Sequence, residues 1–202
     1  IPRDVLFDLD ERKELVKIAP NGERVFYIKG AYKPIPDNKI FYREIDNKNK
    51  EYQLDFDSAV ANYKVLSNSE ILVRTIGPDG QALVVFNFLS EEKKEITNKK
   101  YRSLKWLDFS ENNQKVALVA MPIDGSPFLG LLDLNLKSID TLKNIAQGHY
   151  PIFFDKEMNV IAGEIIDRNT GDKKLEYFKE GEWIPFASYS WSAERFLRPG
   201  LK

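Results

Sequence analysis

Few residues of this chain have the types and spacing that catalysis requires. Its only histidine, His149, lies between Gly148 and Tyr150. A serine protease triad needs a nucleophile in contact with a base that an acid holds in place. The sequence contains no Gly-x-Ser-x-Gly nucleophile elbow. We therefore interpret His149 as a loop or rim residue at a boundary between repeats, not as a general base, and we predict no catalytic residue in this chain.

Metal-dependent or glycosidase-like chemistry would need converging carboxylates or a metal on one surface. The strands that we expect to be innermost offer Lys17, Lys64, Lys105 and Asp108, which form no acidic cluster. The chain has no cysteine, which excludes disulfides and thiolate catalysis but does not fix a compartment. We expect no metal and no cofactor.

The stretch from residue 110 to residue 137 shows most clearly which secondary-structure elements the chain forms. It predicts two strands, Lys115 to Met121 and Phe128 to Leu136, joined by a connection that contains Asp124 and Gly125. Both strands are largely apolar, which is typical of a sheet covered on both faces. Glycine can take the positive φ of a tight hairpin turn, and we expect this conformation at Gly125.

The same order of turn, strand, turn and strand recurs along the chain, in residues 67–89 and 155–178 and more loosely in 20–45. The turn glycines Gly80, Gly125 and Gly171 recur about every 45 residues, which is the period of propeller blades built from four strands. We therefore predict an all-β fold: a β-propeller of four-stranded antiparallel blades, with about four blades present as a partial propeller.

We predict a lead-in at residues 1–10 and four blades at residues 11–57, 60–98, 102–143 and 149–187. Residues 188–202 are predicted to be a tail or the start of a fifth blade. Burial of a large apolar side chain contributes roughly 1.5–3 kcal/mol, so an uncovered blade face would leave much stabilisation unused. We therefore expect the chain to belong to a larger propeller, or to associate with itself through its open blade edges.

Composition excludes several classes of partner. The chain has 202 residues and a formal net charge of −1, so no basic field would attract nucleic acid. No apolar run approaches the roughly 20 residues that span a bilayer. Because the sequence starts with Ile1 and not with methionine, we expect further residues upstream of it.

The sequence motifs near the N-terminus indicate a particular protein family more specifically than the turn sequences do. They read IPRDVLF at residues 1–7, ER at 11–12 and IAPNGERVFYI at 18–28, and they resemble the start of the prolyl oligopeptidase family of serine peptidases. GPDG at 77–80 and KEIT at 94–97 are similar to the hairpins and blade ends of that family. The wording departs from the family at Asp4, Ala19 and Asn21.

This resemblance, which includes the acylaminoacyl-peptidase-like and dipeptidyl-peptidase-like members, implies a propeller placed before an α/β-hydrolase domain. The propeller would screen the peptides that reach a triad in that domain. The implied partners are the hydrolase domain, which this chain lacks, and the peptide substrates of the parent enzyme. Two alternatives stay open: a stand-alone propeller for protein–protein binding, similar to the periplasmic propeller of the Tol system, and a small enzyme acting from a propeller face.

Aromatic and basic residues near the two ends are the candidates for an interface. Trp191 has Arg195 and Phe196 nearby, in a tail that must dock somewhere. Trp106 fits a core pattern, and Trp183 is a rim or edge candidate. The predicted interface residues are Arg3, Phe7, Arg12, Trp191, Arg195 and Phe196.

Overall fold

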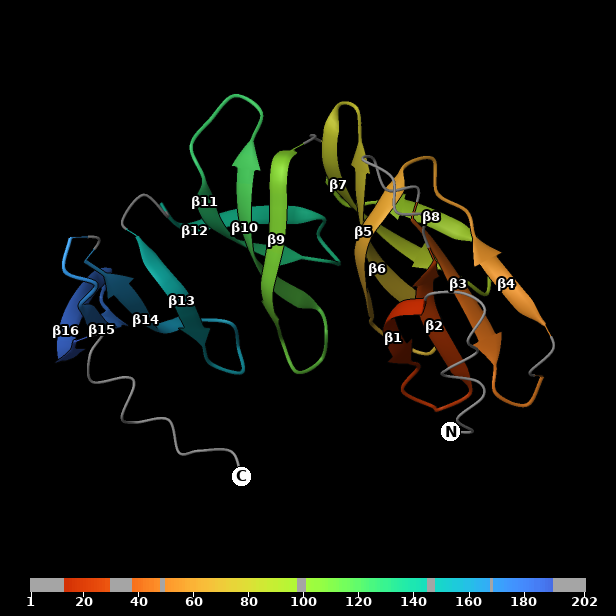
Figure 1. Ribbon diagram of the computed structural model, residues 1–202, viewed down its shortest axis with the longest axis horizontal. Coiled ribbons are helices and arrows are strands. Elements are labelled where there is room, and N and C mark those ends of the chain that lie inside the picture. Colours follow the sequence, from red (N-terminus) through yellow and green to blue (C-terminus); the bar gives the residue numbers. More distant parts are fainter. Residues whose placement is uncertain are drawn as a thin grey trace. The chain divides into compact units, whose positions relative to one another are not determined.

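The computed structural model describes residues 13–29, 38–47, 50–97, 101–144, 148–167 and 169–190. The chain forms two compact units, Ile1–Leu104 and Lys105–Lys202. Antiparallel strands make up the regular structure of the described residues (Figure 1). No helix in this part of the chain is long and apolar enough to cross a membrane. The predicted all-β fold class is confirmed.

The first unit contains a four-stranded antiparallel sheet and a second group of four antiparallel strands that belongs to a larger sheet. The strands of the first sheet, paired in the order β1-β2-β3-β4, are β1 (Lys13–Ile18), β2 (Arg24–Lys29), β3 (Lys39–Glu44) and β4 (Glu51–Leu54). The strands of the second group, in which β8 pairs with β7, are β5 (Ala59–Val65), β6 (Glu70–Gly77), β7 (Gly80–Asn87) and β8 (Glu92–Glu95). Each group follows the chain from one strand to its neighbour, as a propeller blade does.

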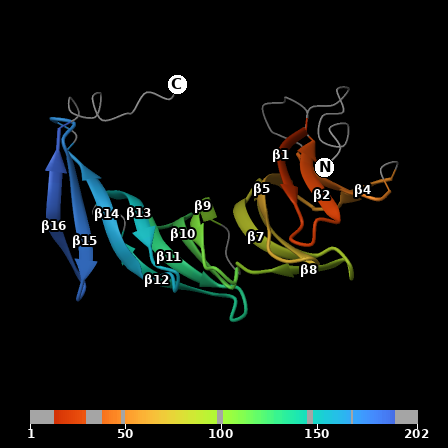
Figure 2. The same ribbon diagram turned by 90° about the horizontal axis from the view of Figure 1, so that it is seen from below.

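Two further sets of four antiparallel strands follow. The first set is β9 (Tyr101–Phe109), β10 (Lys115–Pro122), β11 (Phe128–Asp133) and β12 (Ser138–Asn144), where β9 begins in the first unit with Tyr101 opposite Gln81. The last set, paired in the order β13-β14-β15-β16, is β13 (His149–Phe154), β14 (Val160–Ile166), β15 (Lys173–Lys179) and β16 (Glu182–Tyr189) (Figure 2). Ser188 and Tyr189, at the start of the predicted tail, therefore belong to β16.

In three of the strand groups, the turn between the first two strands has a short polar side chain that accepts a hydrogen bond from a turn amide. The Ser67 hydroxyl accepts a hydrogen bond from the Glu70 amide at 3.1 Å, and the Ser110 hydroxyl accepts one from the Lys115 amide at 2.9 Å. Asp155 plays this part in the last sheet and accepts from the Asn159 side chain and backbone, which lowers the pKa of its carboxyl. Short polar side chains suit these positions because they bond to turn amides that lack a ladder partner.

The connection between β10 and β11 differs from the predicted tight turn. It runs from Ile123 to Pro127, and the φ angle of Gly125 is not in the left-handed region. The expectation of a positive φ at Gly125 is therefore wrong, because a longer connection can reverse the chain without one. Positive φ angles do occur at Gly80 (121°) and Gly171 (76°).

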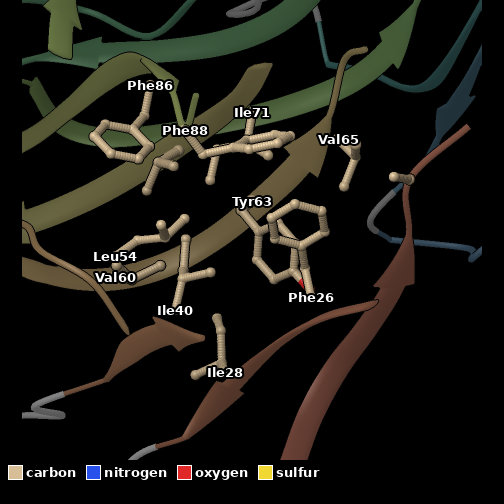
Figure 3. Close-up of a cluster of buried hydrophobic side chains, with 12 residues drawn as sticks. Phe26, Ile28, Ile40, Leu54, Val60, Tyr63, Val65, Ile71, Phe86 and Phe88 are labelled. Carbon is tan, nitrogen blue, oxygen red and sulfur yellow. The ribbon is translucent and has the colours of Figure 1, made fainter. Parts of the chain in front are cut away.

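The two sheets of the first unit pack together through an aromatic and aliphatic core (Figure 3). The Phe26 ring on β2 lies 5.1 Å from Phe88 and 5.6 Å from Tyr42, measured between centroids. The Tyr63 hydroxyl on β5 donates to the Leu15 carbonyl at 2.6 Å, at an irregularity in β1 where Leu15 has a φ of 53°. Burial raises the pKa of Tyr63 far above its ordinary value, so this hydroxyl stays a donor.

The β15–β16 turn allows a first stability prediction. Glu180 (φ 52°) and Gly181 (φ 87°) both take left-handed conformations there, the combination for which Asn-Gly is the preferred sequence. Glu180→Asn should therefore raise the free energy of unfolding by about 0.5 kcal/mol in urea denaturation. The exposed 3.8 Å ion pair with Lys179 that is lost contributes little. Glu182→Asn, inside strand β16, should give no such gain.

Candidate interaction surfaces

The interface residues predicted from the sequence cannot be placed. Arg3, Phe7, Arg12, Trp191, Arg195 and Phe196 all lie outside the described residues. The predicted lead-in and most of the predicted tail lie outside them too. The surfaces below are therefore built from other side chains.

His149 is not the loop or rim residue that its sequence position indicated. It lies in β13, is buried, and its Nε2 atom is 2.5 Å from Oε2 of Glu176 on β15. The Trp183 ring on β16 stacks on the imidazole, with centroids 3.8 Å apart and planes inclined by 13°. Trp183, expected at a rim or edge, thus covers a buried polar pair on one sheet face. Such a pair fixes the packing of this face.

Gly163 on β14 makes this stacking possible. A Cβ atom there would lie 2.9 Å from the Trp183 ring and 3.3 Å from the Cβ of His149. Glycine inside a strand often marks such a close approach between groups. This glycine, which precedes Glu164 in a mostly apolar strand, was the one sequence signal that could have indicated the cluster.

Gly163→Ala should destabilise the last sheet by about 1–3 kcal/mol, because Trp183 must leave its position over His149. The measurement is urea unfolding followed by tryptophan fluorescence. Gly163→Ala with Trp183→Leu should recover part of the loss. A fully additive pair would contradict the proposed steric cause.

The opposite face of the same sheet has a second buried polar group. The Glu164 carboxylate lies 3.2 Å from the Lys173 ammonium and accepts a hydrogen bond from the Tyr189 hydroxyl. The side chains of Glu164 and Lys173 are mostly buried. The ion pair and the hydrogen bond link β14, β15 and β16.

Large apolar side chains are exposed around that group. Phe153, Ala162 and Tyr177 are successive cross-strand partners and therefore share this face. Phe186 lies beside Tyr177, with ring centroids 6.3 Å apart. The exposed fractions are 46% for Phe153, 38% for Tyr177 and 57% for Phe186. A contiguous apolar surface of this kind is typical of an interface, and we name Phe153, Tyr177 and Phe186 the open face.

The first sheet has a charged cluster centred on Glu51. Its carboxylate contacts the Lys29 ammonium at 2.5 Å and accepts hydrogen bonds from Arg43 Nε at 3.2 Å and from the Tyr27 hydroxyl. Burial raises the pKa of Tyr27 well above its ordinary value, and Glu51 adds to the rise. The cluster joins β2, β3 and β4 and has no sequence signature, because its members come from separate strands.

Within the described ranges, no group of three or more His, Cys, Asp or Glu side chains has an arrangement that could hold a metal ion.

Sequence comparisons identify no relative: no protein-family model matches this chain, and no curated protein does. Solved structures do match. TolB from Acinetobacter baumannii is 13% identical with a TM-score of 0.55, over 87% of this chain and 43% of that protein. The β-propeller domain of the Trilobed protease from Pyrococcus furiosus is 12% identical with a TM-score of 0.58, over 88% and 57%. A prolyl endopeptidase is 10% identical with a TM-score of 0.59, over 89% and 30%.

These matches establish the fold alone, because identities are so low. The four-stranded antiparallel sheets are those of a β-propeller domain, similar to peptidase propellers and to TolB. The chain spans 30% to 57% of the length of these three proteins. Its structural neighbours thus include peptidases and TolB.

Proposed function

We propose that this chain is a non-catalytic propeller region of a serine peptidase similar to prolyl oligopeptidase. It gates the access of peptides to an α/β-hydrolase domain and docks on that domain. The blade architecture shared with the Trilobed protease propeller and a prolyl endopeptidase carries the proposal. The IPRDVLF wording at residues 1–7 favours this family over other propellers.

The open face supports the docking part of the proposal. Exposed apolar and aromatic side chains are stabilised when a protein surface covers them. The His149 cluster supports the non-catalytic part, because Glu176 and Trp183 hold the imidazole against a sheet face. An imidazole fixed in this way supports packing.

Labelling with a fluorophosphonate, which reacts with activated serines, tests the proposal. The native polypeptide that contains this sequence, purified from its source, should be labelled at a serine outside residues 1–202. The 202-residue chain by itself should stay unlabelled. An unlabelled native polypeptide, in an extract where other serine hydrolases react, would contradict the proposal.

A second candidate function is a propeller for protein–protein binding without a peptidase. The TolB match, at a TM-score of 0.55 over 87% of this chain, favours it. Affinity capture with the native polypeptide separates the two functions. Stoichiometric recovery of a separate protein together with absence of fluorophosphonate labelling would establish the second candidate. A labelled native polypeptide would exclude it.

The open face also predicts self-association of the chain when no other partner covers it. The double substitution Tyr177→Ser and Phe186→Ser should weaken the association by about tenfold or more, because it removes two exposed aromatic rings. The apparent mass is measured by light scattering over a dilution series. Leu136→Ser, at a 75% exposed residue, is the matched control and should have no effect. A monomeric parent chain at every concentration would contradict the prediction.

A further inference from the structure

The first unit contains a cleft of about 320 Å³, a size within the range of small ligand sites. One wall comes from β3 and β4 with Tyr42 and Tyr52, and the other comes from the β7 and β8 region. Leu54, Phe86 and Phe88 line the cleft and are buried. An apolar floor of this kind takes a ligand with an apolar stem.

The aromatic rings of this region already interact with cations of the chain. The Lys50 ammonium lies 4.6 Å from the centre of the Tyr52 ring, and the Arg24 guanidinium lies 5.4 Å from that of Phe88. Tyr42 and Tyr52 stack with centroids 4.7 Å apart. Aromatic faces attract cations through their quadrupole. Because Lys50, Arg24 and the stacked tyrosine rings already occupy these ring faces, a ligand cation would bind at the rim of the cleft and not over a ring.

Two carboxylates are available at that rim. Asp55 and Glu91 line the cleft and are exposed, and among the described residues neither forms an ion pair or hydrogen bond. Burial is the main cause of the raised pKa of Tyr42, and the charges of Tyr52, Glu44 and Glu91 add to the rise. The negative charge of Glu91 therefore reaches a tyrosine that lines the cleft. Lys93 is the one cation among the lining residues, and its ammonium lies 5.9 Å from the Phe56 ring.

We propose that this cleft binds a lysine or arginine side chain of a polypeptide partner. The aliphatic stem lies on Leu54 and Phe86, and the cationic head lies between the carboxylates of Asp55 and Glu91. Long basic side chains have this combination of an apolar stem and a charged head. The proposal does not depend on the peptidase assignment, because it rests on the cleft alone.

The probes are four acetylated and amidated pentapeptides, in which alanines flank a central lysine, arginine, norleucine or glutamate. Binding to the 202-residue chain is followed by NMR chemical-shift titration. The lysine and arginine peptides should bind about tenfold tighter than the norleucine peptide, and added salt should weaken them. The glutamate peptide should not bind.

Variants of the rim test the negative and the positive charges separately. Asp55→Asn combined with Glu91→Gln should weaken the binding of the lysine peptide by about tenfold, because it removes both exposed carboxylates of the rim. Lys93→Gln should tighten it by about threefold, because a like charge is removed. Glu92→Gln, an exposed neighbour that is not among the lining residues, is the matched control and should change nothing.

The opposite sign expected for Lys93→Gln distinguishes the proposal from a simple apolar groove. Equal binding of the norleucine and lysine peptides would overturn it, and so would binding that none of the three rim substitutions changes. Absence of binding by both basic peptides at millimolar concentration would overturn it as well. Unchanged melting temperatures would show that the variants are folded.

Discussion

Phe26→Ala is expected to lower the free energy of unfolding of the first unit by about 3–5 kcal/mol. Phe26 is fully buried on β2 and contacts the rings of Tyr42, Tyr63 and Phe88. The substitution removes the ring at the centre of the core that joins the first two sheets. These surrounding rings are held by their own strands, so they can close the cavity only in part.

Urea unfolding at neutral pH measures this effect, with the loss of β-strand content followed by far-ultraviolet circular dichroism. Leu89→Ala is the matched control, because Leu89 is adjacent to Phe88 in sequence but 64% exposed. It should change the free energy of unfolding by less than about 0.5 kcal/mol. A loss of less than about 1 kcal/mol for Phe26→Ala would show that the two sheets do not share this core.

Much of the fold could be predicted because each strand has a local signal. The apolar run at 115–121 and the polar turn before it predicted β10, which the structure places at Lys115–Pro122. The predicted strand at 128–136 ends earlier, at Asp133, because the Asp133 side chain accepts hydrogen bonds from the amides of Asn135 and Leu136. Aspartate at a strand end favours such a turn.

The polar clusters could not be predicted in the same way. His149, Glu176 and Trp183 come from three strands, and their contact depends on the register between β13, β14 and β15. A shift of one residue would place Glu176 on the other face. Sequence spacing contains no such information, and a lone histidine beside a glycine was therefore interpreted as a loop residue. The cleft was missed for the same reason, since its two walls belong to different sheets.

The fold supports several functions. Propeller domains similar to this one occur in peptidases and in TolB, so architecture cannot decide between gating and binding. The choice between these functions depends on surface side chains, such as those of the open face and of the cleft, and not on the strand pairing that the propellers share.

Glu51→Gln is expected to lower the free energy of unfolding by about 2 kcal/mol at neutral pH. Burial raises the pKa of Glu51, but the hydrogen bonds from Lys29 and Tyr27 and the charges of Lys29 and Arg43 outweigh it and keep the pKa below its ordinary value. The neutral amide keeps the shape of the side chain but loses its attraction for both cations. Their own side chains are only 16% and 19% exposed, so water replaces the lost attraction poorly.

The pH dependence of this loss follows from the lowered pKa. A carboxyl with a lower pKa in the folded than in the unfolded state stabilises the fold at pH values above the unfolded pKa of about 4.3. That contribution disappears as the pH falls through the folded pKa. Wild-type and Glu51→Gln chains should therefore differ most at neutral pH and converge in strong acid. Glu92→Gln, at an exposed strand residue, should follow the wild-type curve throughout. A difference that stays constant down to strong acid would mean that the amide acts through packing and not through the lost charge.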